Sequence, residues 1–164
     1  MACYILLIEI EEELLLTIGK LGTFQFKPGF YLYVGSARKN LQARINRHLR
    51  HDKKLHWHID YLLTEGEVTE VILIEENEEC RIANTLRGIS EVSFPVPGFG
   101  SSDCRCPGHL FYIQEKNLWE TILVHLRNRG FTIKDYWKGK ISGVKAGLKL
   151  IHLGRFNFDP PLSF

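Results

Sequence analysis

The sequence predicts an α/β (α+β) fold, in which a small antiparallel or mixed sheet is flanked by helices and followed by a basic C-terminal extension. Aromatic and β-branched runs such as residues 30–34 are typical of buried strands. Leu41, Ile45 and Leu49 recur every four positions, which indicates a helix with one apolar side. With 164 residues, 45% of them hydrophobic and 24% charged, the chain is long enough to bury a core.

In the N-terminal half, alternation and turn residues define the expected elements. We expect a strand at 4–10, an exposed turn at 11–13, and a strand at 14–19 that pairs back on the first as a hairpin. Residues 30–34 then complete an antiparallel group of three strands. Two helices follow, at 41–51 and at 55–64.

In the C-terminal half we expect a strand at 68–75, a helix at 78–87, a loop at 93–105, a strand at 109–113 and a helix at 116–129. Gly130 is a typical helix stop. Residues 131–164 mix glycine, lysine and aromatic residues without a clear period, and Pro160-Pro161 ends regular structure. The aromatic residues of this tail are expected either to stack on bases beside phosphate contacts or to dock the tail onto the core. Residues 1–113 are expected to form one domain, and residues 114–164 to pack on it or extend it.

A polar constellation surrounds the break between the strand at 30–34 and the helix after it. Tyr33 leaves the strand just before Gly35 breaks it. Arg44 and His48 are four residues apart on the helix, so their side chains share one side. A tyrosine, a glycine turn and an Arg/His pair form a constellation suited to a phosphate.

Residues 33–35, Tyr-Val-Gly, resemble the second half of the GIY-YIG nuclease signature, with valine for isoleucine. Residues 2–4, Ala-Cys-Tyr, resemble its first half, with alanine for glycine. Blocks at 56–62, 79–80 and 97–111 are similar to a poorly characterised branch of that superfamily, found alone or fused to endonuclease III-like glycosylases. The resemblance covers residues 2–113.

This resemblance implies a phosphodiesterase site. Tyr4 or Tyr33 would position or deprotonate a water molecule, and Arg44 would neutralise the scissile phosphate, with His48 at the position of a family histidine. Glu79 would hold Mg²⁺ or Mn²⁺, and one carboxylate suffices because Mg²⁺ keeps several waters.

A second alignment places the metal position at Asn84, with no carboxylate until Glu91, and would leave the protein without catalysis. With Glu79 as the metal ligand, the predicted function is a metal-dependent, structure-selective DNA nuclease with a role in DNA repair. The alternatives are a catalytically silent nucleic-acid-binding module and a Cys/His metal-binding interaction domain.

The net charge is only +2, but the charges are segregated. Residues 38–54 and 127–155 hold more than half of the 21 lysines and arginines, whereas acidic residues gather at 11–13 and 65–79. Such stretches indicate a polyanion partner, or simply two solvated surfaces. The candidate nucleic-acid contacts are Arg38, Lys39, Arg47, Arg50, Lys53 and Lys54.

Cys104, Cys106 and His109 form a Cys-x-Cys-x₂-His motif that could bind Zn²⁺, with Asp103 or the distant Cys80 as fourth ligand. The alternatives are a loop packed by small side chains, or a His109 that faces the substrate phosphate. His56 and His58 point to different sides of their helix and are not expected to form a metal pair; one is expected to be buried.

No apolar run approaches the ~20 residues of a membrane span. The four cysteines do not suggest a secreted disulfide scaffold. We therefore expect a cytoplasmic protein whose partner is nucleic acid, with DNA as the first expectation, and not a membrane. The sequence predicts no oligomeric state.

Overall fold

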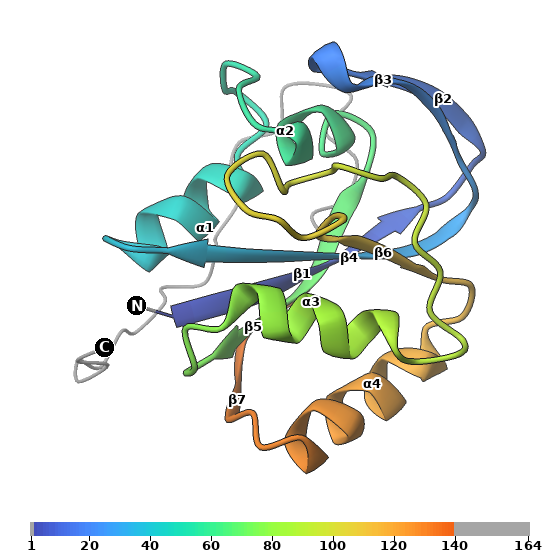
Figure 1. Cartoon of the computed structure of the whole chain (residues 1–164). Helices are drawn as coiled ribbons and strands as arrows, with labels where there is room; N and C mark the ends of the chain where they lie inside the picture. The colour runs from blue at the N-terminus through green and yellow to red at the C-terminus, as the bar shows by residue number, and fades with distance from the viewer. Residues whose placement is uncertain (1, 140–164) are drawn as a thin grey trace.

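In the computed structural model, which describes residues 2–139, a five-stranded antiparallel sheet carries helices on both faces (Figure 1). Its strand order is β6-β4-β1-β5-β7. These strands are β1 (Ala2–Ile10), β4 (Gly29–Ala37), β5 (Glu67–Ile74), β6 (Leu110–Ile113) and β7 (Ile133–Lys138). The predicted fold class is confirmed, and the sheet is antiparallel throughout.

The central strand β1 is buried on both faces, which explains its almost continuous apolar sequence. Successive side chains of a strand point to opposite faces. Tyr4, Leu6 and Ile8 join a core cluster on one face, and Cys3 and Ile5 join a second cluster on the other. The sheet therefore separates two cores.

Each core is closed by its own set of helices (Figure 1). The Tyr4 face is covered by α1 (Leu41–Leu49), α2 (His58–Leu62) and a separate hairpin of β2 (Leu14–Ile18) and β3 (Gly22–Phe26), joined by the 3₁₀ turn Gly19–Leu21. The opposite face is covered by α3 (Glu79–Arg87) and α4 (Asn117–Asn128). No helix within residues 2–139 is long and apolar enough to cross a membrane.

The predicted hairpin between the first two strands is wrong. The two edges of β1 are taken by β4 and β5, and β2 pairs with β3 instead. The physical reason is that β2 alternates between exposed and half-buried residues until Ile18, so it does not suit a place beside a strand that is buried on both faces.

No strand or helix was predicted for residues 133–138. They form β7, an edge strand that pairs antiparallel with β5. Charged residues such as Lys134 and Asp135 hide the strand pattern, and charges are usual on edge strands. Tyr136 and Trp137 of the predicted tail pack against the core, whereas the rest of that tail, residues 140–164, lies outside the described residues.

A buried ion pair ties α1 to α2. Asp60 is fully buried, and both of its oxygens accept hydrogen bonds from the Arg47 guanidinium at 2.8 Å. Oδ2 also accepts from the backbone N–H groups of His56 and Trp57, both at 2.9 Å. Burial raises the pKa of the Asp60 carboxyl, but the hydrogen bonds together lower it by more, so the net pKa lies below the usual value.

We expect Arg47→Ala to lower the free energy of unfolding by about 3 kcal/mol, because it leaves the buried Asp60 carboxylate without its partner. Arg50→Ala is the matched control: Arg50 is an exposed arginine one residue past α1 and has no ion pair within residues 2–139. Urea unfolding of the two variants checks this, and equal stabilities would contradict the role given to the pair.

Candidate active site

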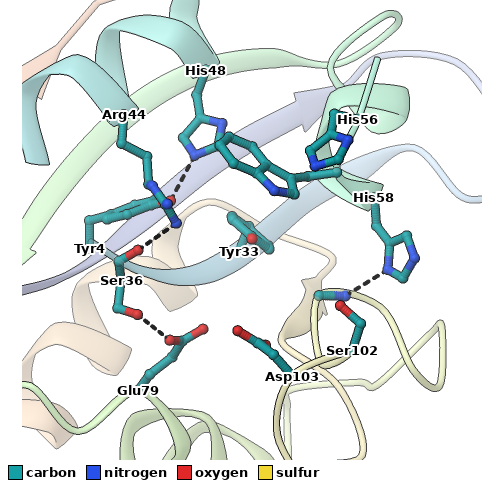
Figure 2. Close-up of a pocket in the computed structure, with 12 residues that line it drawn as sticks. Tyr4, Tyr33, Ser36, Arg44, His48, His56, His58, Glu79, Ser102 and Asp103 are labelled. Atoms are coloured by element: carbon teal, nitrogen blue, oxygen red, sulfur yellow. Dashed lines mark hydrogen bonds between the residues drawn. The ribbon is translucent and has the colours of Figure 1, made fainter. Parts of the chain in front are cut away.

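A pocket of about 340 Å³ lies on the Tyr4 face of the sheet, between α1, the start of α3 and the loop around residue 100 (Figure 2). Its walls come from segments that are far apart in the sequence. The lining residues are Tyr4, Tyr33, Ser36, Arg44, His48, His56, Trp57, His58, Glu79, Gly100, Ser102 and Asp103. The five residues predicted as catalytic, Tyr4, Tyr33, Arg44, His48 and Glu79, are all among them.

The register of β1 and β4 brings the two tyrosines together. Tyr4 lies opposite Gly35, and Tyr33 lies opposite Leu6, so both rings project on one face with centroids 6.4 Å apart. A Cβ atom at Gly35 would lie 2.4 Å from Cζ of Tyr4, so the glycine leaves room for that ring. Gly100, with φ at +71°, does the same for Tyr33, whose Cε2 would lie 2.9 Å from an added Cβ.

Helix α1 delivers Arg44 and His48 to the pocket. Asn40 caps the helix, with φ at 45° and its side-chain oxygen accepting from the Ala43 N–H at 3.0 Å. Arg44 donates from one guanidinium nitrogen to the Ser36 carbonyl at 2.8 Å. His48 Nε2 shares a hydrogen bond with the Tyr4 hydroxyl, 2.7 Å apart. The pair thus ties α1 to two strands: Arg44 contacts β4 through Ser36, and His48 contacts β1 through Tyr4.

Glu79, the first residue of α3, reaches the pocket from the other side of the sheet (Figure 2). One carboxylate oxygen accepts from the Ser36 hydroxyl, and the other lies 2.7 Å from Nδ1 of His109. Burial raises the pKa of the Glu79 carboxyl, but contacts with His109, Ser36 and Arg44 lower it below its usual value. Glu79 is therefore ionised at neutral pH. The alternative metal position, Asn84, is exposed and is not among the residues that line the pocket.

The aromatic groups of the pocket are held neutral. Burial raises the pKa of both Tyr4 and Tyr33, and Arg44 offsets only part of that effect. Burial, with the nearby positive charge of Lys53, lowers the pKa of His48 to about 3. At neutral pH the site thus combines two protonated tyrosines and a neutral histidine with the charges of Arg44 and Glu79.

Seven of the lining residues were not predicted as catalytic, among them Asp103, Ser36 and Trp57. Asp103 enters from the loop, and its carboxylate points toward that of Glu79 (Figure 2). Ser36 bonds Glu79, and Trp57 stacks under the guanidinium of Arg44, 4.8 Å from the ring centroid. For Asp103 and Ser36, the only signal in the sequence was their position beside a motif, since Asp103 precedes Cys104 and Ser36 follows Gly35.

The six predicted nucleic-acid contacts fall into two groups. Arg38, Lys39, Arg50 and Lys54 are exposed and have no ion pair within residues 2–139. Arg47 is instead engaged by Asp60. Lys53 caps α1 by donating to the carbonyls of Arg47 and His48, at 3.1 and 2.8 Å, and its partial burial lowers its pKa to about 8. The side chains of Arg47 and Lys53 are thus engaged within the protein, which makes them weaker candidates for phosphate contacts than the four exposed cations.

Within residues 2–139, the cations of α1 and Arg127 on α4 lie on opposite faces of the sheet, whereas residues 140–155 of the second basic stretch lie outside the described part (Figure 1). His56 and His58 also differ from expectation, since neither is buried and both line the pocket. His58 Nδ1 accepts from the Gly100 N–H at 3.0 Å, which ties the loop to α2.

A second cluster lies behind Glu79. Cys80, Cys104, Cys106 and His109 each offer one ligand atom, and these atoms all lie within 4.8 Å of one another. This set could hold a metal ion. It contains the three predicted ligands, with Cys80 rather than Asp103 as the fourth member. His109 is buried and contacts Glu79, which leaves it unable to face a substrate phosphate.

Comparison with known proteins gives one family. A family model described as a domain of unknown function, DUF123, matches residues 3–130. The match continues through α4, beyond the expected limit at residue 113. No curated protein and no solved structure matches this chain.

The neutral state of His48 makes stability dependent on acid. Its pKa is about 3 in the folded protein and 6.5 in the unfolded chain, so the unfolded state binds one more proton between these values. Stability from this residue is present above pH 6.5 and is lost as the pH falls toward 3, by up to about 1.4 kcal/mol per pH unit. His48→Gln should therefore show a shallower loss than the wild type when urea unfolding is compared at pH 7, 6, 5 and 4; parallel curves would contradict a buried neutral His48.

Proposed function

The chain belongs to the family described as a domain of unknown function, DUF123, and we propose that it is a metal-dependent nuclease of the GIY-YIG type that hydrolyses phosphodiester bonds in DNA. One observation carries this proposal. Tyr4, Tyr33, Arg44, His48 and Glu79 come from four separate elements, and the fold places all of them around a single pocket.

In this proposal Arg44 neutralises charge that develops on the phosphoryl oxygens. Its contact with the Ser36 carbonyl and its stacking on Trp57 hold the guanidinium in place. An arginine has five N–H donors, so the contact with Ser36 leaves donors for a phosphate. A positioned cation of this kind acts on the transition state without a reorganisation cost.

The residues around Glu79 fit a hard divalent cation, Mg²⁺ or Mn²⁺. Each Glu79 oxygen has one neighbour in the protein, and a carboxylate oxygen has two lone pairs, so ligand capacity remains. The Asp103 carboxylate points toward Glu79 and adds oxygen ligands of the kind Mg²⁺ prefers (Figure 2). When bound, the cation would supply charge neutralisation at the phosphate and lower the pKa of a coordinated water.

In this proposal the two tyrosines and His48 orient and deprotonate the attacking water. Tyr33 is only half-buried at the pocket and can orient a water by hydrogen bonding. Tyr4 and His48 Nε2 share a hydrogen bond, so the Tyr4 hydroxyl proton can pass to Nε2 while the Tyr4 oxygen takes a proton from the attacking water. Bound phosphate and cation change the charge around the pair, so the raised pKa of Tyr4 and the lowered pKa of His48 describe the protein without them.

A catalytically silent nucleic-acid-binding module is the second candidate. It is favoured by the burial of Tyr4, which is only 1% exposed, and by the four exposed cations of the stretch 38–54. Both candidates use the same face of the protein. They differ in whether the phosphodiester bond is broken.

Cleavage of labelled single-stranded, duplex, flapped and four-way-junction DNA tests the proposal directly, with Mg²⁺ or Mn²⁺ compared with EDTA. We expect metal-dependent nicking that falls about 100-fold or more in Glu79→Gln and in Arg44→Ala, because each removes charge stabilisation at the reacting phosphate. Arg44→Ala should retain weakened DNA binding. The matched control is Glu78→Gln, the exposed neighbour at the start of α3 that pairs with Arg81.

Near-normal cleavage by Arg44→Ala would rule out the site. Nicking that survives in Glu79→Gln would keep the nuclease and move the cation ligand elsewhere, with Asp103→Asn as the next variant. No cleavage of any substrate, with salt-sensitive binding intact, would establish the silent module instead.

DNA binding in EDTA should depend on Arg38, Lys39, Arg50 and Lys54 and not on the opposite face. Each phosphate contact that is lost reduces the slope of log affinity against log salt by about one. We therefore expect Lys39→Gln and Lys54→Gln to flatten the slope in fluorescence anisotropy titrations. Arg127→Gln, on α4 across the sheet, is the control that should leave it unchanged, and an equal effect of all three would contradict the assigned face.

A further inference from the structure

The cluster behind Glu79 has its own chemistry, distinct from the proposed cleavage. From its donor set and spacing, we infer that Cys80, Cys104, Cys106 and His109 bind one zinc ion, which organises the loop before β6 and fixes the position of Glu79 through His109. The zinc part of this inference does not depend on nuclease activity.

The donor set favours zinc over the hard cations proposed for the pocket. Three thiol groups and an imidazole are soft or borderline ligands, which suit Zn²⁺, whereas Mg²⁺ and Mn²⁺ prefer oxygen. Cys₃His is a usual composition for a structural zinc site. The sulfurs carry no competing disulfide, since all four cysteines of the chain are free.

The spacing suits a single tetrahedral ion. With Zn–S of ~2.3 Å and Zn–N of ~2.0 Å, a sulfur and a nitrogen bound to one zinc lie ~3.5 Å apart. Sγ of Cys104 and Nε2 of His109 are 3.5 Å apart. The four ligand atoms all lie within 4.8 Å, so a small inward movement completes the tetrahedron.

The ligands join two parts of the fold that are distant in sequence. Cys80 is on the first turn of α3, and the other three lie in the loop 93–109, which has little regular structure. Two backbone hydrogen bonds close this loop, from Gly98 N–H to the Pro107 carbonyl at 2.6 Å and from His109 N–H to the Phe99 carbonyl at 2.7 Å. An ion bound across it would fasten the loop to α3.

The geometry of His109 links this site to the pocket. Its Nε2 faces the thiol cluster, and its Nδ1 lies 2.7 Å from a Glu79 oxygen. Histidine ligands of zinc usually donate their second N–H to a carboxylate, which fixes the tautomer and the ring. Glu79 is therefore a second-layer partner of the zinc on one oxygen and a pocket carboxylate on the other, while Asp103 points into the pocket (Figure 2).

Metal analysis of the full chain, purified without chelator or metal-affinity tag, tests the inference. We expect one zinc per chain by inductively coupled plasma mass spectrometry. Reconstitution with Co²⁺ should give the thiolate-to-cobalt charge-transfer bands and the visible bands of a tetrahedral site. Cys80→Ser and Cys104→Ser should lose the zinc. Cys3→Ala is the matched control, because Cys3 is a free cysteine buried in β1 outside the cluster.

The second-layer role of Glu79 has its own readout. Glu79→Gln should keep the cobalt bands but weaken zinc binding about 10- to 100-fold in chelator competition, because the carboxylate no longer supports His109. Asp103→Asn should leave zinc affinity unchanged. Circular dichroism of each variant shows whether it is folded.

A wild-type chain that holds no zinc and gives no thiolate-to-cobalt bands would overturn the site. Loss of zinc in Asp103→Asn but not in Cys80→Ser would overturn the ligand assignment. Unchanged zinc affinity in Glu79→Gln would overturn the link to the pocket. None of these results depends on cleavage, so a failed nuclease assay and a failed zinc assay remain separate outcomes.

Discussion

The antiparallel register of β1 and β4 is the constraint on which the pocket depends. It places Tyr4 directly over Gly35 and sets Tyr33 on the same face, two positions along the strand pair. The predicted strand break at Gly35 is wrong, because β4 runs on to Ala37. Only a residue without a Cβ leaves room for the Tyr4 ring, so this glycine is needed for packing and not for a turn. The same register carries Ser36 past Tyr4, where its hydroxyl and carbonyl reach Glu79 and Arg44 respectively. One strand pair thus positions pocket side chains that come from helices on both faces of the sheet.

Around that strand pair, the charged groups divide into those that build the pocket and those that remain available. Arg47 and Asp60 form the link between α1 and α2, and Arg47 also stacks on Trp57, 4.2 Å from the ring centroid. Arg44 lies over the same ring and keeps donors for a ligand. The basic stretch is therefore not a uniform electrostatic surface. Its inner cations stabilise the fold, and its outer cations are the ones that a polyanion can reach.

Glu79 stands where two proposed metal sites meet. One of its oxygens faces the pocket wall at Ser36, and the other contacts His109, whose far nitrogen belongs to the Cys/His cluster. Cys80, the next residue on α3, is itself in that cluster. Because the first turn of α3 holds both residues, the position of the carboxylate and the integrity of the cluster are mechanically coupled. A loop with little regular structure can in this way hold the Glu79 carboxylate of the neighbouring helix in a defined orientation.

The sequence by itself determined the elements with strong local patterns and the residues of short motifs. The apolar run of β1, the four-residue period of α1 and the Gly130 stop predicted those elements, and the motif resemblance pointed to Tyr4, Tyr33, Arg44, His48 and Glu79. Only the tertiary structure decided which strands pair, because β2 and β7 are half-exposed and carry weak patterns that several partners could satisfy. It also decided that Asp103 enters the pocket, that Cys80 completes the cluster and that Arg47 is consumed by Asp60. Each of these contacts joins residues that are far apart in the sequence. Local sequence spacing cannot predict them, because it does not determine which distant segments pack together.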